Sequence, residues 1–375
     1  MNVSVNEPDL SGNEKRYLAE CVDTGWISSE GPFVERLERG MAARCGRAHG
    51  VAVCNGSAAL DAAVMALGLP KGSEVILPSF TIISCAAAVL RAGLVPVLAD
   101  SLPDTWNMDV ASVEAKITPN TRAVMAVHIY GMPVDMAALC ALASARGLLV
   151  IEDAAEAIGQ TCSNKACGGW GHVSCLSFYP NKHVTTGEGG MILCDDDALA
   201  ERCRSLRNLC FAPPRRFVHD ALGFNFRMSN LQAAVGMAQL ERLDASVSKK
   251  RSTGAMYQSL LKGVRGLRLP VERTEYAENI YWVFGLVLED GFGAEDAAVE
   301  FERRLKERGV GTRPFFWPMH EQPVFQKMGM FRGERYPVAE AIARRGFYIP
   351  SGLAMTDVQI EYCAEAVRSV AEELA

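Results

Sequence analysis

CLSFYPNKHVTTGEGGMIL, residues 175 to 193, consists of an apolar run, a polar loop and a second apolar run. The first run ends near Ser177, and Lys182 lies in the loop before Gly187. Most lysines are solvated surface groups. A lysine held between two buried strands, in a loop rich in Gly, Ser and Thr, has a lowered amine pKa, which favours its use as a nucleophile that forms Schiff bases. Lys182 is therefore our candidate catalytic residue.

The apolar runs around this loop belong to a longer series. Short β-rich runs occur at VAVC (51), EVILP (74), VPVLA (95), AVMAVHI (123), LLVIE (148), CLSFY (175) and MILC (191). Ala- and Leu-rich stretches of helix length lie between most of them. This alternation predicts an α/β fold whose central sheet is mostly parallel, with helices on both faces. The near-continuous apolar character of the runs is typical of such buried strands.

The pattern changes after a helix expected near residues 229 to 261. YWVFGLVLE, residues 281 to 289, is then the first strand of a smaller α+β domain. A chain of 375 residues exceeds what one hydrophobic core usually serves. We expect a large domain over residues 1 to 245, including the N-terminal segment, and a small C-terminal domain over residues 246 to 375.

Composition excludes several classes of partner. The net charge of −6 leaves no overall positive field for binding nucleic acid. The twelve cysteines contain no CxxC spacing, which indicates a reduced, cytoplasmic compartment rather than a disulfide framework. The polar N-terminus does not resemble a signal peptide. The longest apolar stretch, near residues 82 to 90, is far short of the ~20 residues that span a membrane, so we expect no membrane association.

Two further motifs lie where a parallel sheet binds its ligands, beyond the carboxyl ends of strands. In VAVCNGSAAL, a strand runs through Gly56 and Ser57 into an Ala-rich helix, whose free N–H groups and the Ser57 hydroxyl could cradle a phosphate. A capped helix after a tight turn would give the same pattern.

In LLVIEDAAEA, Glu152 and Asp153 follow a buried strand. Such a carboxylate could anchor a cationic ring nitrogen or cap the next helix. We take Asp153 as the residue that faces the ligand side.

Taken together, these motifs resemble the DegT-type family of sugar aminotransferases. The resemblance covers nearly the whole chain, in the order TGWISSEGP, NGSAAL, EVILPSFT, VHIYGMP, IEDAAEA, SFYPNKHVTTGEGG, GFNFRMSNLQAA and GTRPFFWPMH. It implies a fold-type I aminotransferase that uses pyridoxal 5'-phosphate. Several of the forms are most similar to the perosamine branch, which aminates carbon 4 of a GDP-linked 4-keto-6-deoxyhexose. The family also has a dehydratase branch in which a histidine replaces the Schiff-base lysine, and this chain keeps Lys182.

The resemblance assigns roles to individual residues. Lys182 would hold the cofactor as a Schiff base and move the substrate proton, and Asp153 would pair with the protonated pyridine nitrogen. Asn225 would reach the phosphate from the neighbouring subunit, which implies a homodimer with shared active sites. The remaining phosphate contacts would come from Gly56, Ser57, Ala58 and Ser177.

The chain departs from the family pattern at two positions. Ile82 stands where relatives usually carry an aromatic ring that stacks on the cofactor, so dispersion contact remains and π-stacking is lost. Glu156 stands where many relatives carry Gln or His near the cofactor's phenolate oxygen. Two anions there repel unless they share a proton. Glu156 matches the perosamine branch.

The substrates implied by the resemblance are L-glutamate and a nucleotide-linked keto sugar. The stretch GTRPFFWPMHEQP places Arg313 beside several aromatic residues, including Phe316, which suits a diphosphate next to a flat base. An aromatic cluster that joins the two domains would give the same composition. His320 and Trp26 match positions near the substrate in relatives, and Arg227 is a candidate for the carboxylate of the amino donor.

Other functions fit the sequence less well. No GxGxxG opens a helix and no GxxxxGK is present, which argues against a dinucleotide-dependent dehydrogenase and a kinase. The histidines show no HExxH or comparable metal spacing, so we expect no metal site. His183 adjoins Lys182, but neighbouring side chains usually point apart, and we assign it no role. A 3-keto sugar, a UDP- or dTDP-linked substrate, and a non-catalytic regulator that keeps the cofactor remain open.

Overall fold

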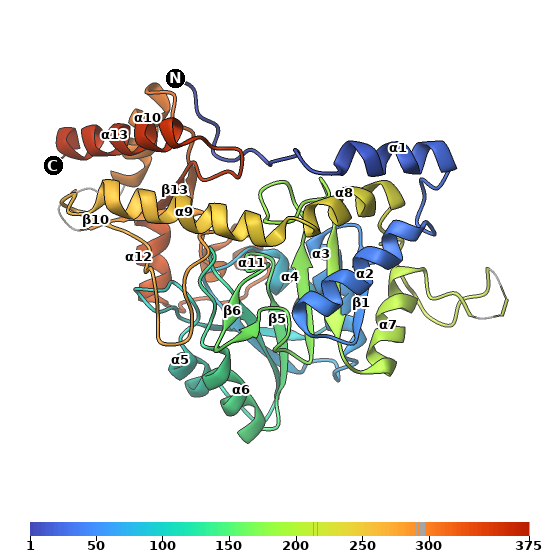
Figure 1. Ribbon diagram of the computed structural model, residues 1–375. Coiled ribbons are helices and arrows are strands. Elements are labelled where there is room, and N and C mark those ends of the chain that lie inside the picture. The colour runs from blue at the N-terminus through green and yellow to red at the C-terminus, as the bar shows by residue number, and fades with distance from the viewer. Residues whose placement is uncertain (213, 216, 290–291, 293–296, 375) are drawn as a thin grey trace.

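A central sheet of seven strands organises the larger part of the computed structural model, which describes residues 1–212, 214–215, 217–289, 292 and 297–374 (Figure 1). The strand order is β1-β9-β8-β5-β4-β2-β3. The strands are β1 (His49–Val53), β2 (Glu74–Pro78), β3 (Val95–Ala99), β4 (Thr121–Val127), β5 (Leu149–Asp153), β8 (Val173–Ser177) and β9 (Gly190–Cys194). Strand β9 pairs antiparallel with both β1 and β8, and the other pairs are parallel. Each of the seven predicted runs is a strand of this sheet, and the mostly parallel architecture is confirmed.

Helices cover both faces of the sheet because successive strand residues point to opposite sides. One face packs Val51 and Ile151 against α3 (Gly56–Ala66), α4 (Ser84–Arg91) and α7 (Asp197–Arg207). The other face packs Ala52 and Val150 against further helices. These are α1 (Glu14–Thr24), α2 (Pro32–Cys45), α6 (Met136–Ala145) and α8 (Asn230–Leu240). Helix α5 (Val110–Ala115) and the hairpin β6 (Thr161–Cys162) to β7 (Lys165–Ala166) add Val113 and Cys162 to the same core.

A second, antiparallel sheet follows in the C-terminal part of the chain, with the order β10-β11-β13-β12. The strands are β10 (Leu267–Arg268), β11 (Phe284–Leu288), β12 (Arg313–Pro314) and β13 (Gly346–Ile349). The helices of this part are α10 (Ala297–Glu307), α11 (Pro323–Lys327), α12 (Pro337–Arg345) and α13 (Asp357–Leu374), with a short 3-10 turn η2 (Met319–Glu321). Its own apolar core includes Phe284, Phe301, Leu305 and Val367.

Helix α9 (Leu243–Leu261) runs from the first sheet to the second and packs against α13 (Figure 1). The single helix expected near residues 229 to 261 is divided into α8 and α9, and the predicted domain boundary near residue 245 falls at the start of α9. The first residues of the N-terminal segment, which we assigned to the larger domain, pack instead in the smaller one. Val3 is buried in that core and forms a parallel bridge with Val310, because burial there removes its apolar side chain from water.

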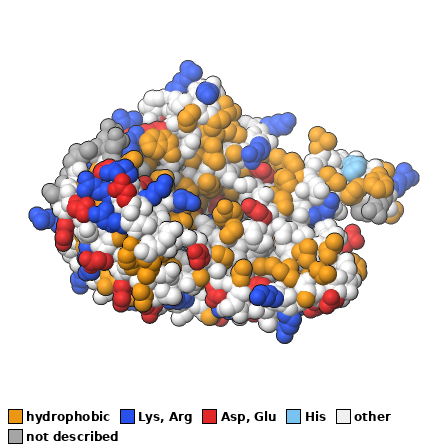
Figure 2. All heavy atoms as spheres, turned by 90° about the horizontal axis from the view of Figure 1, so that it is seen from above, with side chains coloured by type: hydrophobic (Ala, Val, Ile, Leu, Met, Phe, Trp, Pro, Cys, Tyr) orange, Lys and Arg blue, Asp and Glu red, His pale blue; other side chains and the backbone are white. Residues whose placement is uncertain are grey.

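The segment between α7 and α8 projects from the body of the molecule (Figure 1). Among its described residues, Phe217 is 75% exposed and Leu222 is 95% exposed. Hydrophobic side chains gather on this projection in Figure 2. No described helix has the length and apolar character needed to cross a membrane.

Candidate active site

A pocket of about 540 Å³ opens where β5 and β8 end and α3 begins. Its walls come from distant parts of the chain, because the carboxyl ends of parallel strands meet at one edge of the sheet. Eight predicted site residues line it: Gly56, Ser57, Ile82, Asp153, Glu156, Ser177, Lys182 and Phe316. The structure thus brings the three sequence motifs, from strand ends at β1, β5 and β8, to one cavity.

Glu152 and Asp153 point to opposite sides of β5, as the alternation of a strand requires. Asp153 lines the pocket and is 3% exposed. Its Oδ1 accepts a hydrogen bond from the Ala155 N–H at 3.0 Å, and the Cys85 thiol donates to its Oδ2 at 3.3 Å. Burial raises the pKa of Asp153, although these hydrogen bonds and Lys182 oppose the rise. A cationic group in the pocket would find a desolvated, hydrogen-bonded carboxylate there.

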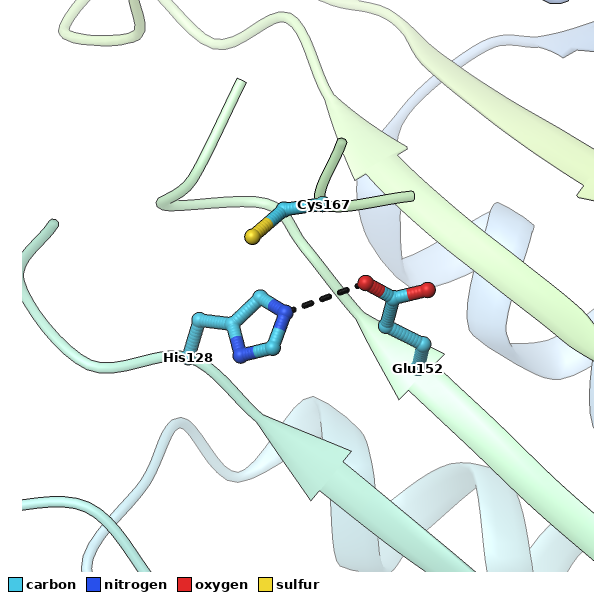
Figure 3. A group of neighbouring side chains, drawn as sticks. All are labelled: His128, Glu152 and Cys167. Atoms are coloured by element: carbon cyan, nitrogen blue, oxygen red, sulfur yellow. Dashed lines mark hydrogen bonds and ion pairs between the residues drawn. The ribbon is translucent and has the colours of Figure 1, made fainter. Parts of the chain in front are cut away.

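Glu152 belongs to a buried network on the far side of the strand, together with His128 and Cys167 (Figure 3). Although burial opposes it, hydrogen bonds from His128 and others lower the pKa of Glu152 to about 2. Its other donors are the N–H groups of Gly168, Trp170 and Gly171 and the Ser174 hydroxyl.

Hydrogen bonds fix the side chains of His128 and Glu152 in this group. His128 Nδ1 accepts from the Val134 N–H at 3.2 Å, so Nε2 carries the proton toward Glu152 Oε1 at 3.1 Å. Burial raises the pKa of the Cys167 thiol well above its usual range, so this side chain keeps its proton. The ligand atoms of this group are thus committed to hydrogen bonds or remain protonated.

The Lys182 amine lies in the pocket close to Glu156 and to the Trp282 ring. It is 9% exposed, its Nζ lies 3.7 Å from Glu156 Oε1, and it lies over the Trp282 ring, 3.6 Å from the centroid. Burial lowers the pKa of Lys182, against the opposing attraction of Glu156 and Asp153. The buried position therefore favours a neutral, nucleophilic amine more than a position at the surface would.

Glu156 faces Lys182 from the turn that follows β5. Its Oε2 accepts a hydrogen bond from the Tyr130 N–H at 2.9 Å. Burial, with repulsion from Asp153, raises the pKa of Glu156 to about 7, although Lys182 and the Tyr130 bond oppose the rise. A carboxyl group with this pKa can keep its proton near neutral pH, which would relieve the repulsion predicted between Glu156 and the cofactor's phenolate oxygen.

The start of α3 is where we predicted a phosphate cradle, and it lies at the pocket. The Ser57 hydroxyl lies 2.7 Å from that of Ser84 on α4, and both residues line the pocket. Gly56 is needed for close approach, because a Cβ added there would lie 2.8 Å from Ser177 Cβ. The Ala58 backbone, which we also predicted to contribute, is occupied within the helix. Its N–H donates to the Asn55 side chain at 2.8 Å as part of the helix cap, and Ala58 does not line the pocket.

Five other predicted residues lie outside the pocket of this chain. Asn225 is exposed and bridges Asn208, whose side chain accepts from Arg227 at 2.6 Å. Trp26 is 50% exposed in the loop between α1 and α2. Arg313 is exposed on β12, where it pairs with Tyr348, a residue of the pocket wall.

His320 is the fifth. It is 3% exposed, and its ring nitrogens lie 2.9 Å from Ser79 Oγ and 3.1 Å from Glu340 Oε1. These two bonds use both of its nitrogens, so the structure does not bring His320 to the pocket.

Several residues of the pocket have no signal in the sequence. Trp282 and Tyr348 come from the C-terminal part, and Tyr130 packs beside them with Phe316. Only the tertiary fold places the Trp282 ring beside Lys182 and packs Tyr130 against Trp282, Phe316 and Tyr348. Ser84 could have been found, since it opens a helix directly after the predicted cofactor-stacking position at Ile82.

Comparison with known proteins agrees with this architecture. The profile of the DegT/DnrJ/EryC1/StrS aminotransferase family matches residues 8–368. The chain belongs to this family. The predicted family, fold and enzyme class are thereby confirmed.

Individual members of the family resemble the chain over almost its full length. GDP-perosamine synthase of Caulobacter vibrioides is 40% identical over 370 residues, which cover 98% of each chain. The putative pyridoxal phosphate-dependent aminotransferase EpsN of Bacillus subtilis is 35% identical over 364 residues, or 95% of this chain and 92% of EpsN. The structure of Helicobacter pylori PseC, an aminotransferase involved in the biosynthesis of pseudoaminic acid, superposes with a TM-score of 0.94 over 100% of both chains. At 20% identity it supports the fold alone.

Proposed function

We propose that the protein uses pyridoxal 5'-phosphate to transfer an amino group from L-glutamate to a nucleotide-linked 4-keto-6-deoxy sugar. One observation carries the proposal: a buried amine (Lys182), a buried carboxylate (Asp153) and the first turn of α3 face the same pocket. Relatives named GDP-perosamine synthase and pyridoxal phosphate-dependent aminotransferase support the substrate class and the cofactor.

The residues of the pocket fit this cofactor. Lys182 would hold it covalently through Nζ, Asp153 would pair with its ring nitrogen, and Gly56, Ser57 and Ser177 would hold its phosphate. Ile82 lines the pocket and would contact the ring through dispersion forces. When bound, the cofactor supplies an electron sink for the carbanion formed on the substrate.

The chain's own groups would move the protons. Lys182 has a lowered pKa, so its neutral amine can take a proton from the donor carbon and return one to the acceptor carbon. Glu156, with a pKa raised to about 7 and 3.7 Å from Nζ, can accept or give a proton near neutral pH. The aromatic side chains of Trp282, Phe316 and Tyr348 line the pocket and limit the access of water.

The nucleotide-sugar would approach from the side of β12. Arg313 pairs with Tyr348 at the pocket wall and is exposed, so its guanidinium can meet a diphosphate by a small movement of the side chain. Phe316 lines the pocket, and Trp317 beside it is 45% exposed, which suits a flat base or sugar face. These contacts do not select among GDP, UDP and dTDP.

The active form is proposed to be a homodimer with shared sites. The projecting segment between α7 and α8 exposes Phe217 and Leu222, and Asn225 near its base lies outside the pocket of its own chain. A second copy covering this segment would bury the apolar side chains and bring Asn225 to the neighbouring phosphate. The use of cysteine along the chain supports a cytoplasmic location for this enzyme.

The shared site can be tested by mixing two inactive variants. Lys182→Ala and Asn225→Ala subunits, unfolded and refolded together, should regain activity, because one site of each mixed dimer has both residues intact. Refolding each variant alone is the control. Activity no higher than that of the separate variants would reject shared sites.

The substrate is tested by offering one 4-keto-6-deoxy sugar linked to GDP, one linked to dTDP, and a UDP-linked 3-keto sugar, each with L-glutamate. Mass spectrometry and NMR of the products identify the carbon that gains the amine. The proposal predicts amination at carbon 4 and fastest turnover with the GDP sugar. Amination at carbon 3, or no turnover of any keto sugar, would contradict it.

A further inference from the structure

Lys250 is a buried lysine in the centre of α9 that the proposed reaction leaves without a role. It is 1% exposed, and among the described residues its amine forms no ion pair. Nζ instead donates to two backbone carbonyls, that of Trp282 at 2.8 Å and that of Ser351. Burial lowers the pKa of Lys250 to about 7, and no carboxylate among the described residues pairs with its amine to offset the cost of burying its charge.

The two carbonyls join elements that meet at the active site. Trp282 precedes β11, and Ser351 follows β13. Because these strands are antiparallel neighbours, Lys250 ties α9 to one end of the pair, where β11 begins and β13 ends. The residue before Trp282 is strained: Tyr281 has φ of +48°, in the left-handed region that side chains other than glycine rarely adopt. Such a conformation is unfavourable and persists only where its surroundings impose it. The bond from Lys250 to the Trp282 carbonyl is one such constraint.

Trp282 is the connection between Lys250 and the catalytic pocket. Its ring lies beneath Lys182 Nζ, 3.6 Å from the centroid, and its Nε1 donates to the Asn181 carbonyl at 2.8 Å. The backbone of Trp282 is held from one side by Lys250, and its ring is held on the other by the loop that carries Lys182.

We propose that Lys250 is a positioning residue that keeps the Trp282 ring against the Lys182 amine and so keeps water from it. The inference rests on the proposed function only in assigning Lys182 its role. The shielding itself concerns the chain alone, so it can be measured without cofactor or substrate.

The direction of the effect follows from the relative sizes of two opposing influences. A ring beneath an ammonium group stabilises the charged form, which raises the amine pKa by at most about 1.5 units. Loss of hydration disfavours it more strongly, by up to about 3–5 pKa units in full burial. Burial is the largest influence on the pKa of Lys182, so loss of the ring should raise that pKa.

Other charged groups act on Lys182 as well. Glu156, in the turn after β5, and Asp153, at the end of β5, favour the charged form of Lys182. Lys250, on α9, and Lys182 each disfavour the charged form of the other. His183 is buried, and both lysines lower its pKa. Removing Lys250 could therefore act on Lys182 directly, without Trp282, and the experiment must separate the two routes.

The test measures the reactivity of Lys182 in the full-length protein freed of cofactor. Acetic anhydride labels neutral amines, so the labelling rate of the Lys182 peptide against pH, followed by mass spectrometry, gives the pKa of this amine. Lys250→Met and Trp282→Leu are each expected to raise it by about one unit, which is a tenfold fall in rate below the pKa. The matched control is Tyr257→Phe. Tyr257 lies on the same helix, and its hydroxyl donates at 2.8 Å to the adjacent carbonyl of Pro350, so its loss should change the rate less than twofold.

The double variant decides whether Lys250 acts through Trp282. If it does, Lys250→Met adds less than a twofold change when Trp282 is already Leu. A full tenfold change in that background, an unchanged rate in Lys250→Met alone, or an equal change in Tyr257→Phe would overturn the inference. Should Lys250→Met not fold, Lys250→Gln takes its place, with the same expected and contradicting outcomes. A protein that fails to transaminate but shows the expected labelling would refute the proposed function and leave this inference standing.

Discussion

Replacing Glu156 with Gln changes one charge in the pocket with little change in shape. The substituted amide would keep an oxygen for the Tyr130 N–H, which Glu156 Oε2 now accepts at 2.9 Å. What is lost is the carboxylate 3.7 Å from Lys182 Nζ. Because a nearby anion favours the charged amine, Glu156→Gln should lower the pKa of Lys182, in the direction opposite to Lys250→Met.

The separation of the two groups sets the size of the change. Two full charges 3.7 Å apart interact by about 4 kcal/mol at an effective dielectric constant of about 20, which corresponds to roughly 3 pKa units. This is an upper limit, because the pKa of Glu156 is about 7 and the group is only partly ionised at neutral pH. We therefore expect the pKa of Lys182 to fall by about one to two units.

The assay is the same pH-dependent labelling of Lys182 in the cofactor-free protein, with the pH titration of the visible absorption band as a second readout in the loaded protein. The control is Glu188→Gln, since Glu188 also lines the pocket but is not among the groups that act on the pKa of Lys182. An unchanged or raised Lys182 pKa in Glu156→Gln, or an equal fall in the control, would refute this account of the pocket's charge.

Three further substitutions test other walls of the pocket. Asp153→Asn should reduce kcat about ten- to a hundredfold, because a hydrogen bond to a charged group contributes about 1.5–3 kcal/mol. Steady-state kinetics measure this, and a kcat near that of wild type would exclude Asp153 as the partner of the ring nitrogen. Ser57→Ala should weaken cofactor binding about tenfold or more for the same reason, as measured by fluorescence titration, and an unchanged Kd would remove Ser57 from the phosphate cradle. Ile82→Tyr should tighten cofactor binding about two- to tenfold, since an aromatic contact adds about 0.5–1.5 kcal/mol; a Kd no lower than that of wild type would show that the missing ring has no cost.

The sheet and the charged residues at its edge were predictable because their signals are local. Each of the seven strands is a short apolar run bounded by polar or turn residues, and strand alternation separates Asp153 from Glu152. Ala58 shows the limit of that reasoning. The motif locates the start of α3, but which N–H groups stay free depends on the Asn55 side chain, which already accepts from Ala58.

The contributions of the C-terminal part were not predictable in the same way. Trp282 and Lys250 reach the pocket's surroundings only through the packing of the second sheet and α9 against the first sheet, and neither lies in a local pattern that indicates ligand binding. The first residues of the chain were misplaced because they add one bridge, Val3 to Val310, and have no periodicity of their own. Contacts between residues this distant in sequence are set by tertiary structure.

The central claim is that Lys182 holds pyridoxal 5'-phosphate and that L-glutamate donates the amine. The most direct test is the absorption spectrum of the purified protein with this cofactor, before and after the addition of L-glutamate, for wild type and Lys182→Ala. We expect a visible band that glutamate removes in the wild type and that is missing in the variant. No band in the wild type, or a band that glutamate leaves unchanged, would contradict it.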